Sequence, residues 1–222
     1  MKRVLLSWSS GKDSAWTLHV LRATNVEVVG LVTTFNETAG RVAMHGVRRD
    51  LVLAQAGALG LPLWSIPLPS PCSDAVYEAR MMAFLEQAKE GGITHVAFGD
   101  LFLQEIRAYR ERQMAACGLE PLFPVWCSAE ETDELAQLMV RSGVRAVITC
   151  VDPKQLPAEF VGRCFDRRLL SQLPAAVDRC GERGEFHTFC FAGPMFPSAI
   201  PVKLGEKVVR DGFCFADVVL RP

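Results

Sequence analysis

The chain has 222 residues, with 24 Lys and Arg against 25 Asp and Glu and a formal net charge of -1. This balance argues against a general nucleic-acid surface, which would be basic, and no run approaches the roughly 20 apolar residues of a membrane helix. Half of the residues are hydrophobic, enough for the core of one large or two small domains. The apolar run after Lys2 and Arg3 is too short for a secretory signal, so we expect a cytoplasmic protein.

Strand and helix patterns alternate over the first half of the chain. We expect strands at residues 3–8, 27–34, 63–68, 94–98 and 120–125, and helices at residues 13–23, 47–59, 74–90 and 106–117. The run 28–32 is continuously apolar, which is typical of a strand buried on both faces of a parallel sheet. This alternation predicts an α/β fold, with a Rossmann-like parallel sheet and helices on both of its faces. Ligands of such sheets bind at the carboxyl ends of the strands.

The pattern changes after Trp126. We expect a helix at residues 130–141, a strand at 144–151, a short helix at 165–173, a strand at 185–191, and a hairpin of strands 202–209 and 213–220. Asp211-Gly212 has the residue types of a tight hairpin turn. A boundary near Cys127 would divide the chain into a first domain of residues 1–127 and a smaller α/β domain of residues 128–222.

The eight cysteines form no C-x-x-C pair, so zinc-ribbon and thioredoxin spacings are missing. Thiols of a cytoplasmic chain stay reduced, and we expect these cysteines to act as small buried hydrophobes. Cys180 is of more interest, because it borders a charged segment.

The loop Ser9-Ser10-Gly11-Lys12-Asp13-Ser14 follows the first strand and opens the first helix. Small residues let backbone N–H groups converge, and a helix N-terminus adds partial positive charge, so the loop predicts a nucleotide-phosphate site. A Walker A loop is excluded, because Leu6 and Asp13 stand where that motif needs Gly and Ser or Thr. The alternative is an ordinary strand–turn–helix with a serine cap.

A second polar cluster runs from Cys180 to Phe189. If Glu185 and His187 lie in a strand they share one face, and a carboxylate beside an imidazole can move a proton. One alternative is a charged loop with a strand edge at the surface. A metal site made of Glu182, Glu185 and His187 is another, although nothing in the spacing fixes a tetrahedral set.

Further candidates lie at strand ends and on one helix. Gly99-Asp100 follows a strand of the first domain. Arg107, Arg110 and Glu111 share a helical face, where arginines could reach substrate or phosphate; a solvated, ion-paired helix is the alternative.

Thr33 and Thr34 end the second strand, where an adenosine pocket should lie. His45 either stacks near the adenine or caps the following helix.

The loop at residues 9–14 resembles the S-G-G-x-D-S loop of the PP-loop ATP pyrophosphatases, with Ser10 where that family usually has its first glycine. The segment Gly181–Thr188 reads G-E-x-G-E-[FY]-x-T. In this order, with Gly99-Asp100 between them, the motifs are similar to those of the diphthine–ammonia ligase family, one branch of the PP-loop enzymes. Met44-His45-Gly46-Val47 and residues 107–111 also look like segments of that family.

The resemblance implies an adenine nucleotide alpha hydrolase-like ATP domain followed by a family-specific substrate domain. It implies an ATP-dependent ligase that adenylates a carboxylate, releases pyrophosphate, and forms an amide when ammonia displaces AMP. The partners implied are ATP, ammonia and a carboxylate acceptor, either protein-borne diphthine or a small molecule, with Mg²⁺ as cofactor and no membrane.

The implied roles are distributed over both domains. The catalytic candidates are Lys12, Asp13, Asp100, Glu182 and Glu185, with Asp13 and Asp100 also proposed to ligate Mg²⁺. The candidates for nucleotide binding are Ser9, Ser10, Gly11, Lys12, Asp13, Ser14, Thr33, His45 and Gly99. The candidates for substrate binding are Arg107, Arg110, Glu111, His187 and Thr188.

Two other functions stay open at this point. A PP-loop enzyme acting on tRNA would usually carry reactive cysteine pairs or a basic face, and this chain has neither pattern. A non-catalytic adenine nucleotide sensor would not require the polar cluster at 182–188. The oligomeric state is also open, with a homo-oligomer among the alternatives.

Overall fold

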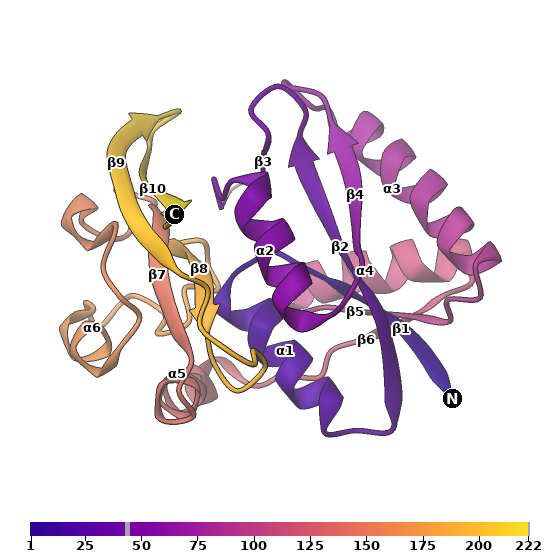
Figure 1. Cartoon of the computed structure of the whole chain (residues 1–222), viewed down its shortest axis with the longest axis horizontal. Helices are drawn as coiled ribbons and strands as arrows, with labels where there is room; N and C mark the ends of the chain where they lie inside the picture. Colours follow the sequence, from indigo (N-terminus) through magenta and orange to yellow (C-terminus); the bar gives the residue numbers. More distant parts are fainter. Residues whose placement is uncertain (43–44, 222) are drawn as a thin grey trace.

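Two β-sheets organise the chain in the computed structural model, which describes residues 1–42 and 45–221 (Figure 1). Met44, part of the segment 44–47 named above, lies outside the described residues. Sheet A has six strands and belongs to the first part of the chain, whereas sheet B has four strands and belongs to the second.

Sheet A is almost entirely parallel. Its strands are β1 (Lys2–Ser7), β2 (Val26–Asn36), β3 (Arg41–Val42), β4 (Leu63–Leu68), β5 (His95–Ala97) and β6 (Glu120–Leu122). Their order is β3-β2-β1-β5-β6, with β4 also pairing with β2. The short β3 runs antiparallel to β2, and the other pairs are parallel.

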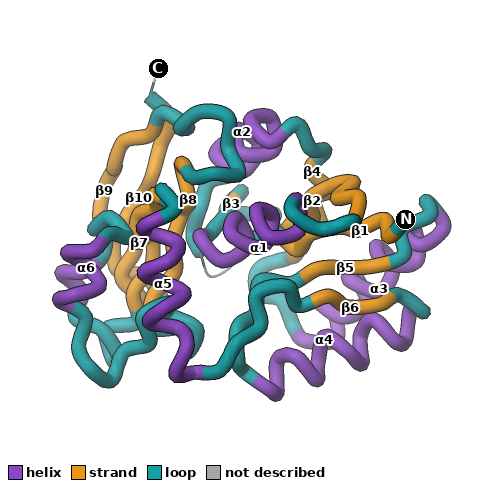
Figure 2. Tube along the Cα trace, turned by 90° about the horizontal axis from the view of Figure 1, so that it is seen from below, coloured by secondary structure: helices purple, strands orange, loops and turns teal. Residues whose placement is uncertain are grey.

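Helices cover both faces of sheet A, as predicted (Figure 2). They are α1 (Lys12–Arg22), α2 (Arg49–Leu59), α3 (Asp74–Glu90) and α4 (Gln104–Cys117). Neighbouring side chains of β1 point to opposite faces of the sheet. Leu6 packs in one core cluster with Leu18 of α1 and Leu51 of α2. Its neighbour Leu5 points the other way, into a cluster with Leu85 and Met114 of α3 and α4.

Sheet B is antiparallel, in the order β8-β7-β10-β9. Its strands are β7 (Arg145–Val151), β8 (Phe186–Ala192), β9 (Val202–Arg210) and β10 (Phe213–Leu220). Two α-helices, α5 (Thr132–Arg141) and α6 (Arg167–Gln172), and two 3₁₀ turns at Ala129–Glu131 and Ala158–Phe160 complete this part. Asp211 and Gly212 both have positive φ, 51° and 83°, which gives the predicted two-residue hairpin turn.

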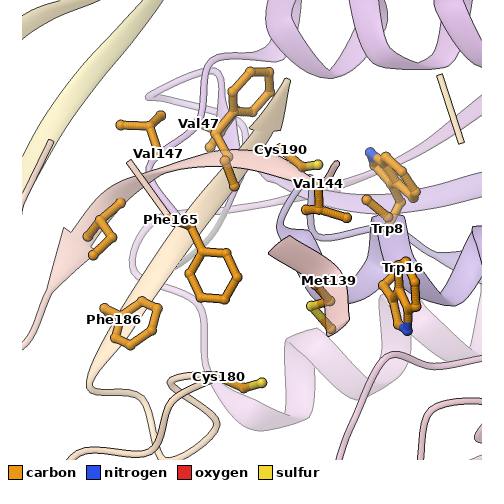
Figure 3. Packing of buried hydrophobic residues seen from close by; sticks show 14 of the residues in the cluster. Trp8, Trp16, Val47, Met139, Val144, Val147, Phe165, Cys180, Phe186 and Cys190 are labelled. Carbon is orange, nitrogen blue, oxygen red and sulfur yellow. The ribbon is translucent and has the colours of Figure 1, made fainter. Parts of the chain in front are cut away.

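One hydrophobic cluster joins the two parts. Trp8 and Trp16 of the first part belong to the same buried set as Met139, Phe165 and Phe186 of the second (Figure 3). The proposed division at Cys127 stays a prediction, since apolar packing runs across it without a gap. None of the helices in the described ranges combines the length and apolarity needed to cross a membrane.

Element ends differ from the expectations by a few residues. The expected helix 130–141 begins as a 3₁₀ turn, and β6 stops at Leu122 rather than at 125. The expected strand 185–191 starts one residue later, at Phe186. Glu185 therefore precedes β8, because its carboxylate is engaged by amides of the preceding loop.

Candidate active site

A cavity opens where β1, β2 and β5 end and sheet B meets them. It has an apolar lobe of about 460 Å³, lined in part by Val32, Thr33 and Ile66. A polar lobe of about 240 Å³ is lined by the loop after β1 and by the start of β8. The lobes share the residues Ser7, Ser9, His45, Phe98, Asp100, Arg110, Glu182 and His187. These volumes and this mixture of walls suit a small-molecule site.

A buried glutamine holds the backbone of the loop at residues 9–14 through hydrogen bonds. Gln55 of α2 accepts from Trp8 Nε1 at 2.8 Å and donates to the carbonyls of Ser10 at 3.0 Å and Cys190 at 2.7 Å. Cys190 N in turn donates to Ser10 O at 2.9 Å. The loop is thereby tied to α2 and to β8 at once, which sets its position without any ligand.

Ser10 occupies a backbone conformation that favours glycine. Its φ is 70°, in the left-handed region that costs a non-glycine residue energy. Its hydroxyl is buried and has no hydrogen-bond partner among the described residues. The family's usual glycine at this position has a physical reason here, and Ser10 itself does not line the cavity.

The N-terminus of α1 borders the polar lobe, and some of its backbone N–H groups have no backbone acceptor among the described residues. Lys12 N donates to the hydroxyl of Thr188, and Ala15 N to the carbonyl of Gly11, both at 3.1 Å. No side chain caps the helix at Gly11. The N–H groups of Asp13 and Ser14 find no backbone acceptor in the described part of the chain, as is usual for a first helical turn. Such an end attracts anions.

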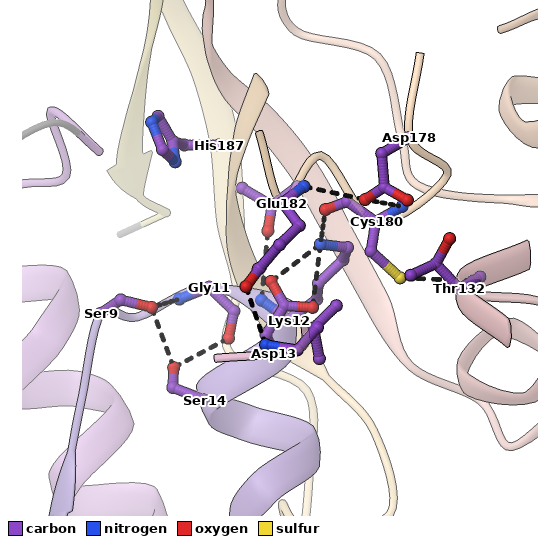
Figure 4. Close-up of polar contacts among 12 residues, drawn as sticks. Ser9, Gly11, Lys12, Asp13, Ser14, Thr132, Asp178, Cys180, Glu182 and His187 are labelled. Atoms are coloured by element: carbon purple, nitrogen blue, oxygen red, sulfur yellow. Dashed lines mark hydrogen bonds and ion pairs between the residues drawn. The ribbon is translucent and has the colours of Figure 1, made fainter. Parts of the chain in front are cut away.

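Lys12 of α1 connects the first part of the chain to the second. Its Nζ contacts both carboxylate oxygens of Asp13, at 2.8 and 3.0 Å, and donates to the carbonyl of Cys180 (Figure 4). The side chain is 2% exposed. Burial, the largest single influence, would lower the pKa of Lys12, but the charges of Asp13, Cys180 and Asp178 and the hydrogen bond to Asp13 together raise it, so the ammonium stays charged. Its donors face protein atoms here, so a direct role on phosphate stays a prediction.

Three carboxyl groups surround the polar lobe: Asp13, Asp100 and Glu182. Glu182 accepts from Leu101 N at 2.7 Å. Burial raises the pKa of Glu182 to about 8; the Leu101 amide opposes this shift, and the charges of Asp13 and Asp100 reinforce it. Burial likewise raises the pKa of Asp100, against the opposing charge of Arg110. Both carboxyl groups therefore favour their neutral form more than an exposed acid does.

Glu185 does not line this cavity. It is 2% exposed, and its oxygens accept from Asp178 N at 2.8 Å and from Arg183 N at 3.0 Å. The expected shared strand face of Glu185 and His187 is wrong, because Glu185 lies in the loop before β8. Its observed contacts hold the loop that presents Glu182.

Two neutral histidines stand between the lobes. The rings of His45 and His187 lie 4.6 Å apart, and His45 Nδ1 is 3.3 Å from the carbonyl of Thr188. Burial lowers the pKa of His45 to about 4 and that of His187 to about 3. Both imidazoles are uncharged at pH 7 and can offer a donor and an acceptor.

The predicted substrate-binding residues of α4 lie partly at the cavity and partly at the surface. Arg110 lines both lobes, and its Nε is 3.6 Å from Asp100 Oδ2. Arg107 and Glu111 form an exposed pair at 2.9 Å and line neither lobe, which matches the alternative of an ion-paired surface.

Other predicted residues lie at the cavity. Ser9, Ser14 and Gly99 line the polar lobe, and Thr33 lines the apolar lobe, with its hydroxyl donating to Trp8 O at 2.7 Å. Gly99 packs tightly on α1, because a Cβ there would lie 3.1 Å from Ser14 N. Gly11 lies beside Thr188, with similarly little space for a Cβ.

The sequence analysis missed Gln55, Tyr77 and Met81. Tyr77 and Met81 line the apolar lobe from α3, and their spacing of four residues on one predicted helix is the one signal that could have suggested that they share a face. Gln55 carries no motif, and only its burial in a predicted helix sets it apart. The parallel sheet and the cavity at the ends of its strands define the class of protein, an α/β protein with a small-molecule site.

Comparison with known protein families identifies the family of this chain. Residues 1–121 match the diphthamide synthase N-terminal domain and residues 131–219 match the diphthamide synthase C-terminal domain. The chain therefore belongs to the diphthamide synthase family.

Curated relatives support this assignment. The chain is 28% identical to a diphthine–ammonia ligase of Rattus norvegicus and 26% to one of Bos taurus. Each comparison covers 97% of this chain and 88% of the relative. The resemblance inferred from the motifs is confirmed, and with it the assignment as an ATP-dependent amide ligase. A tRNA enzyme and a non-catalytic sensor are not favoured.

Proposed function

We propose that this protein uses ATP to convert a carboxylate into an acyl adenylate, and that ammonia then displaces AMP to form an amide, as in a diphthine–ammonia ligase. The observation that supports this most is the meeting of the open N-terminus of α1 with three carboxyl groups in one polar lobe. Adenylation needs donors that hold the phosphates, and the attack of ammonia on the acyl adenylate at the same place needs a group that takes up a proton.

The shape and polarity of the two lobes favour one orientation of the nucleotide. Its adenine would lie in the apolar lobe, against Val32, Ile66 and Met81, and its phosphates would extend toward Asp13 N and Ser14 N. Ser9 Oγ, which lies 3.2 Å from Ser14 Oγ, adds a hydroxyl beside the same path. A charge-assisted bond from each backbone amide would stabilise the leaving pyrophosphate.

The acids of the polar lobe fit Mg²⁺. Asp100 Oδ2 is buried with no hydrogen-bond partner among the described residues, and oxygen ligands are what this ion prefers. No group of three His, Cys, Asp or Glu side chains within the described ranges is arranged to hold a metal. This suits an ion that takes most of its ligands from phosphate and water. When bound through Asp100 and Asp13, it would neutralise phosphate charge.

Glu182 is suited to the proton transfers of amide formation. Its pKa of about 8 lies close to a physiological operating pH, where a group can both accept and donate a proton. Ammonia that attacks an acyl adenylate must lose a proton, and Glu182 faces the lobe where that carbon would lie. His187 and Arg110 border the same space and would position the acceptor.

The acceptor is proposed to be a carboxylate of the diphthine type, carried on a protein or on a small molecule. We also propose a cytoplasmic location, in keeping with eight free cysteines.

The test is the identity of the products. Protein, ATP, Mg²⁺, ammonium and a carboxylate acceptor are mixed, and the nucleotides are separated by chromatography. AMP and pyrophosphate are expected, and ADP with phosphate would overturn the mechanism. Glu182→Gln is expected to keep nucleotide binding and to lose at least about a hundredfold in turnover. Glu159→Gln, an exposed carboxylate outside the cavity, is the matched control.

A further inference from the structure

A second cavity lies at the far end of sheet B. It encloses about 440 Å³ between the start of β7, the end of β8, the end of β10 and the segment that leads into β9. It shares no lining residue with the nucleotide cavity. Its volume is in the range of small-molecule sites, and nothing in the ligase reaction uses it.

The walls of this second cavity are apolar. They include Val147, Phe191, Ile200, Val202, Leu204 and Val218. Leu204 is 50% exposed, although its partner on the neighbouring strand is the buried Val218. Covering such surface is favourable by roughly 25 cal/mol per Å², so the cavity would gain from an apolar occupant.

The rim carries charge of one sign. Arg145, Lys203 and Arg221 line the cavity, and no Asp or Glu does. None of the three forms an ion pair with a described residue. Arg145 lies over the ring of Phe191, with 5.1 Å between its Cζ and the ring centroid. Since the chain as a whole carries a net charge of -1, this concentration of cations is local.

We propose that the second cavity binds a small amphipathic carboxylate, with its apolar chain or ring against Val147 and Phe191 and its anionic group among Arg145, Lys203 and Arg221. Apolar burial supplies the affinity, and the uncompensated cations select an anion over a neutral or cationic head group. The limited volume suits one small molecule rather than a helix of another protein, whose diameter is about 10 Å.

A cysteine in the cavity provides a direct readout. Cys164 lines the second cavity and is exposed, and Cys72, in the loop before α3, is the other exposed cysteine. An occupant should shield Cys164 from alkylation and leave Cys72 reactive. The two labelling rates can be measured in one sample by mass spectrometry of the peptides, so Cys72 reports any general effect on the protein.

The probes are decanoate, decanol and decylammonium below their micelle concentrations. Decanoate is expected to slow labelling of Cys164 at saturation by at least about fivefold, with Cys72 unchanged, and decanol to act more weakly. High salt should weaken the effect of decanoate, because the rim is solvent-exposed. Arg145→Gln with Lys203→Gln should reduce it severalfold, whereas Arg168→Gln, exposed on α6 outside the cavity, should not.

Three results would overturn the proposal. Cys164 could label at the same rate with and without decanoate. The three probes could protect it equally, which would mean simple apolar partitioning. Cys164 could also become protected without any probe as protein concentration rises, which would assign this surface to a second copy of the chain. Thermal melting of each variant confirms that loss of protection is not loss of the fold.

Discussion

The loop at residues 9–14 contains a strained residue whose strain can be measured. Ser10 has a φ of 70° because Gln55 and Cys190 fix its carbonyl from two sides. The sequence shows that Ser10 replaces the family's usual glycine, but it does not show that the backbone at this position is left-handed. That conformation is set by contacts with residues 45 and 180 positions away in the sequence.

Replacing Ser10 with glycine is expected to stabilise the protein by about 0.5–1 kcal/mol. Relief of the left-handed strain should exceed the entropy that glycine adds to the unfolded chain, and the Ser10 hydroxyl has no partner to lose. Urea unfolding measures the change. Ser10→Ala removes the same hydroxyl but keeps the strain, so it should be less stable than the glycine variant. Equal stability of the two would contradict this account.

The two cavity histidines predict a pH effect of definite sign. Their pKa values of about 4 and about 3 lie below the ordinary value of 6.5. Between pH 6.5 and 4 the unfolded chain therefore binds more protons than the folded one, and stability falls as the solution is acidified. Each histidine contributes at most about 1.4 kcal/mol per pH unit. His187→Gln should flatten this acid limb, measured by urea unfolding from pH 4 to 7; an unchanged slope would refute the buried neutral state.

Glu182 should have an effect of the opposite sign, spread over the range from pH 4.5 to about 8. Its pKa of about 8 lies above the ordinary 4.5, so the folded protein holds a proton that the unfolded chain releases. This contribution to stability is complete below pH 4.5 and is lost as pH rises through about 8. Urea unfolding of Glu182→Gln from pH 4 to about 9 should show a smaller loss of stability with rising pH than the parent, and a loss as steep as in the parent would count against the raised pKa.

At the scale of elements, the parallel sheet followed from sequence patterns and its details did not. The continuous apolar run of β2 and the glycine and proline stops after α2 predicted the order of strands and helices. The strand β3 was not predicted, because its two residues, Arg41 and Val42, are too few to show a periodic pattern. Their pairing with β2 depends on a turn. The sequence predicts a strand that begins at Glu185, yet two amides of the preceding loop hold this residue outside β8.

Gln55 is the test of how α2 supports the site. Gln55→Met keeps the volume but leaves Trp8 Nε1 and the Cys190 carbonyl without their partner. Buried groups left unsatisfied cost about 1–3 kcal/mol each, so a loss of about 2–4 kcal/mol in unfolding free energy is expected, with weaker ATP binding. Gln87→Met, exposed on α3, should stay within about 0.5 kcal/mol. Calorimetry of both variants decides, and a neutral Gln55→Met would contradict the role.

Across the whole molecule, one carboxylate of sheet B holds the segment that carries His45. Asp217 of β10 accepts from Arg41 at 2.8 Å and from Arg48 at 2.6 Å, and Arg41 also donates to Gly46 O at 2.7 Å. The motifs of the sequence pointed to both halves of the site. They could not predict this contact, because 169 residues separate Arg48 from Asp217 and neither belongs to a motif.

Asp217→Asn should loosen His45 and leave the fold intact. Loss of the charged hydrogen bonds is expected to cost about 1–3 kcal/mol and to weaken ATP binding severalfold. The pKa of His45, about 4 when buried, should rise toward its ordinary value, which nuclear magnetic resonance of the imidazole can follow. Glu134→Gln, exposed on α5, is the control. An unchanged His45 titration would show that Asp217 does not position it.

The most direct test of the central claim is a crystal structure with a non-hydrolysable ATP analogue and Mg²⁺. The account predicts the adenine in the lobe lined by Val32 and Ile66, and the phosphates on the amides of Asp13 and Ser14 with Glu182 facing them. A triphosphate bound away from the N-terminus of α1, or a nucleotide in the second cavity at the end of sheet B, would contradict it.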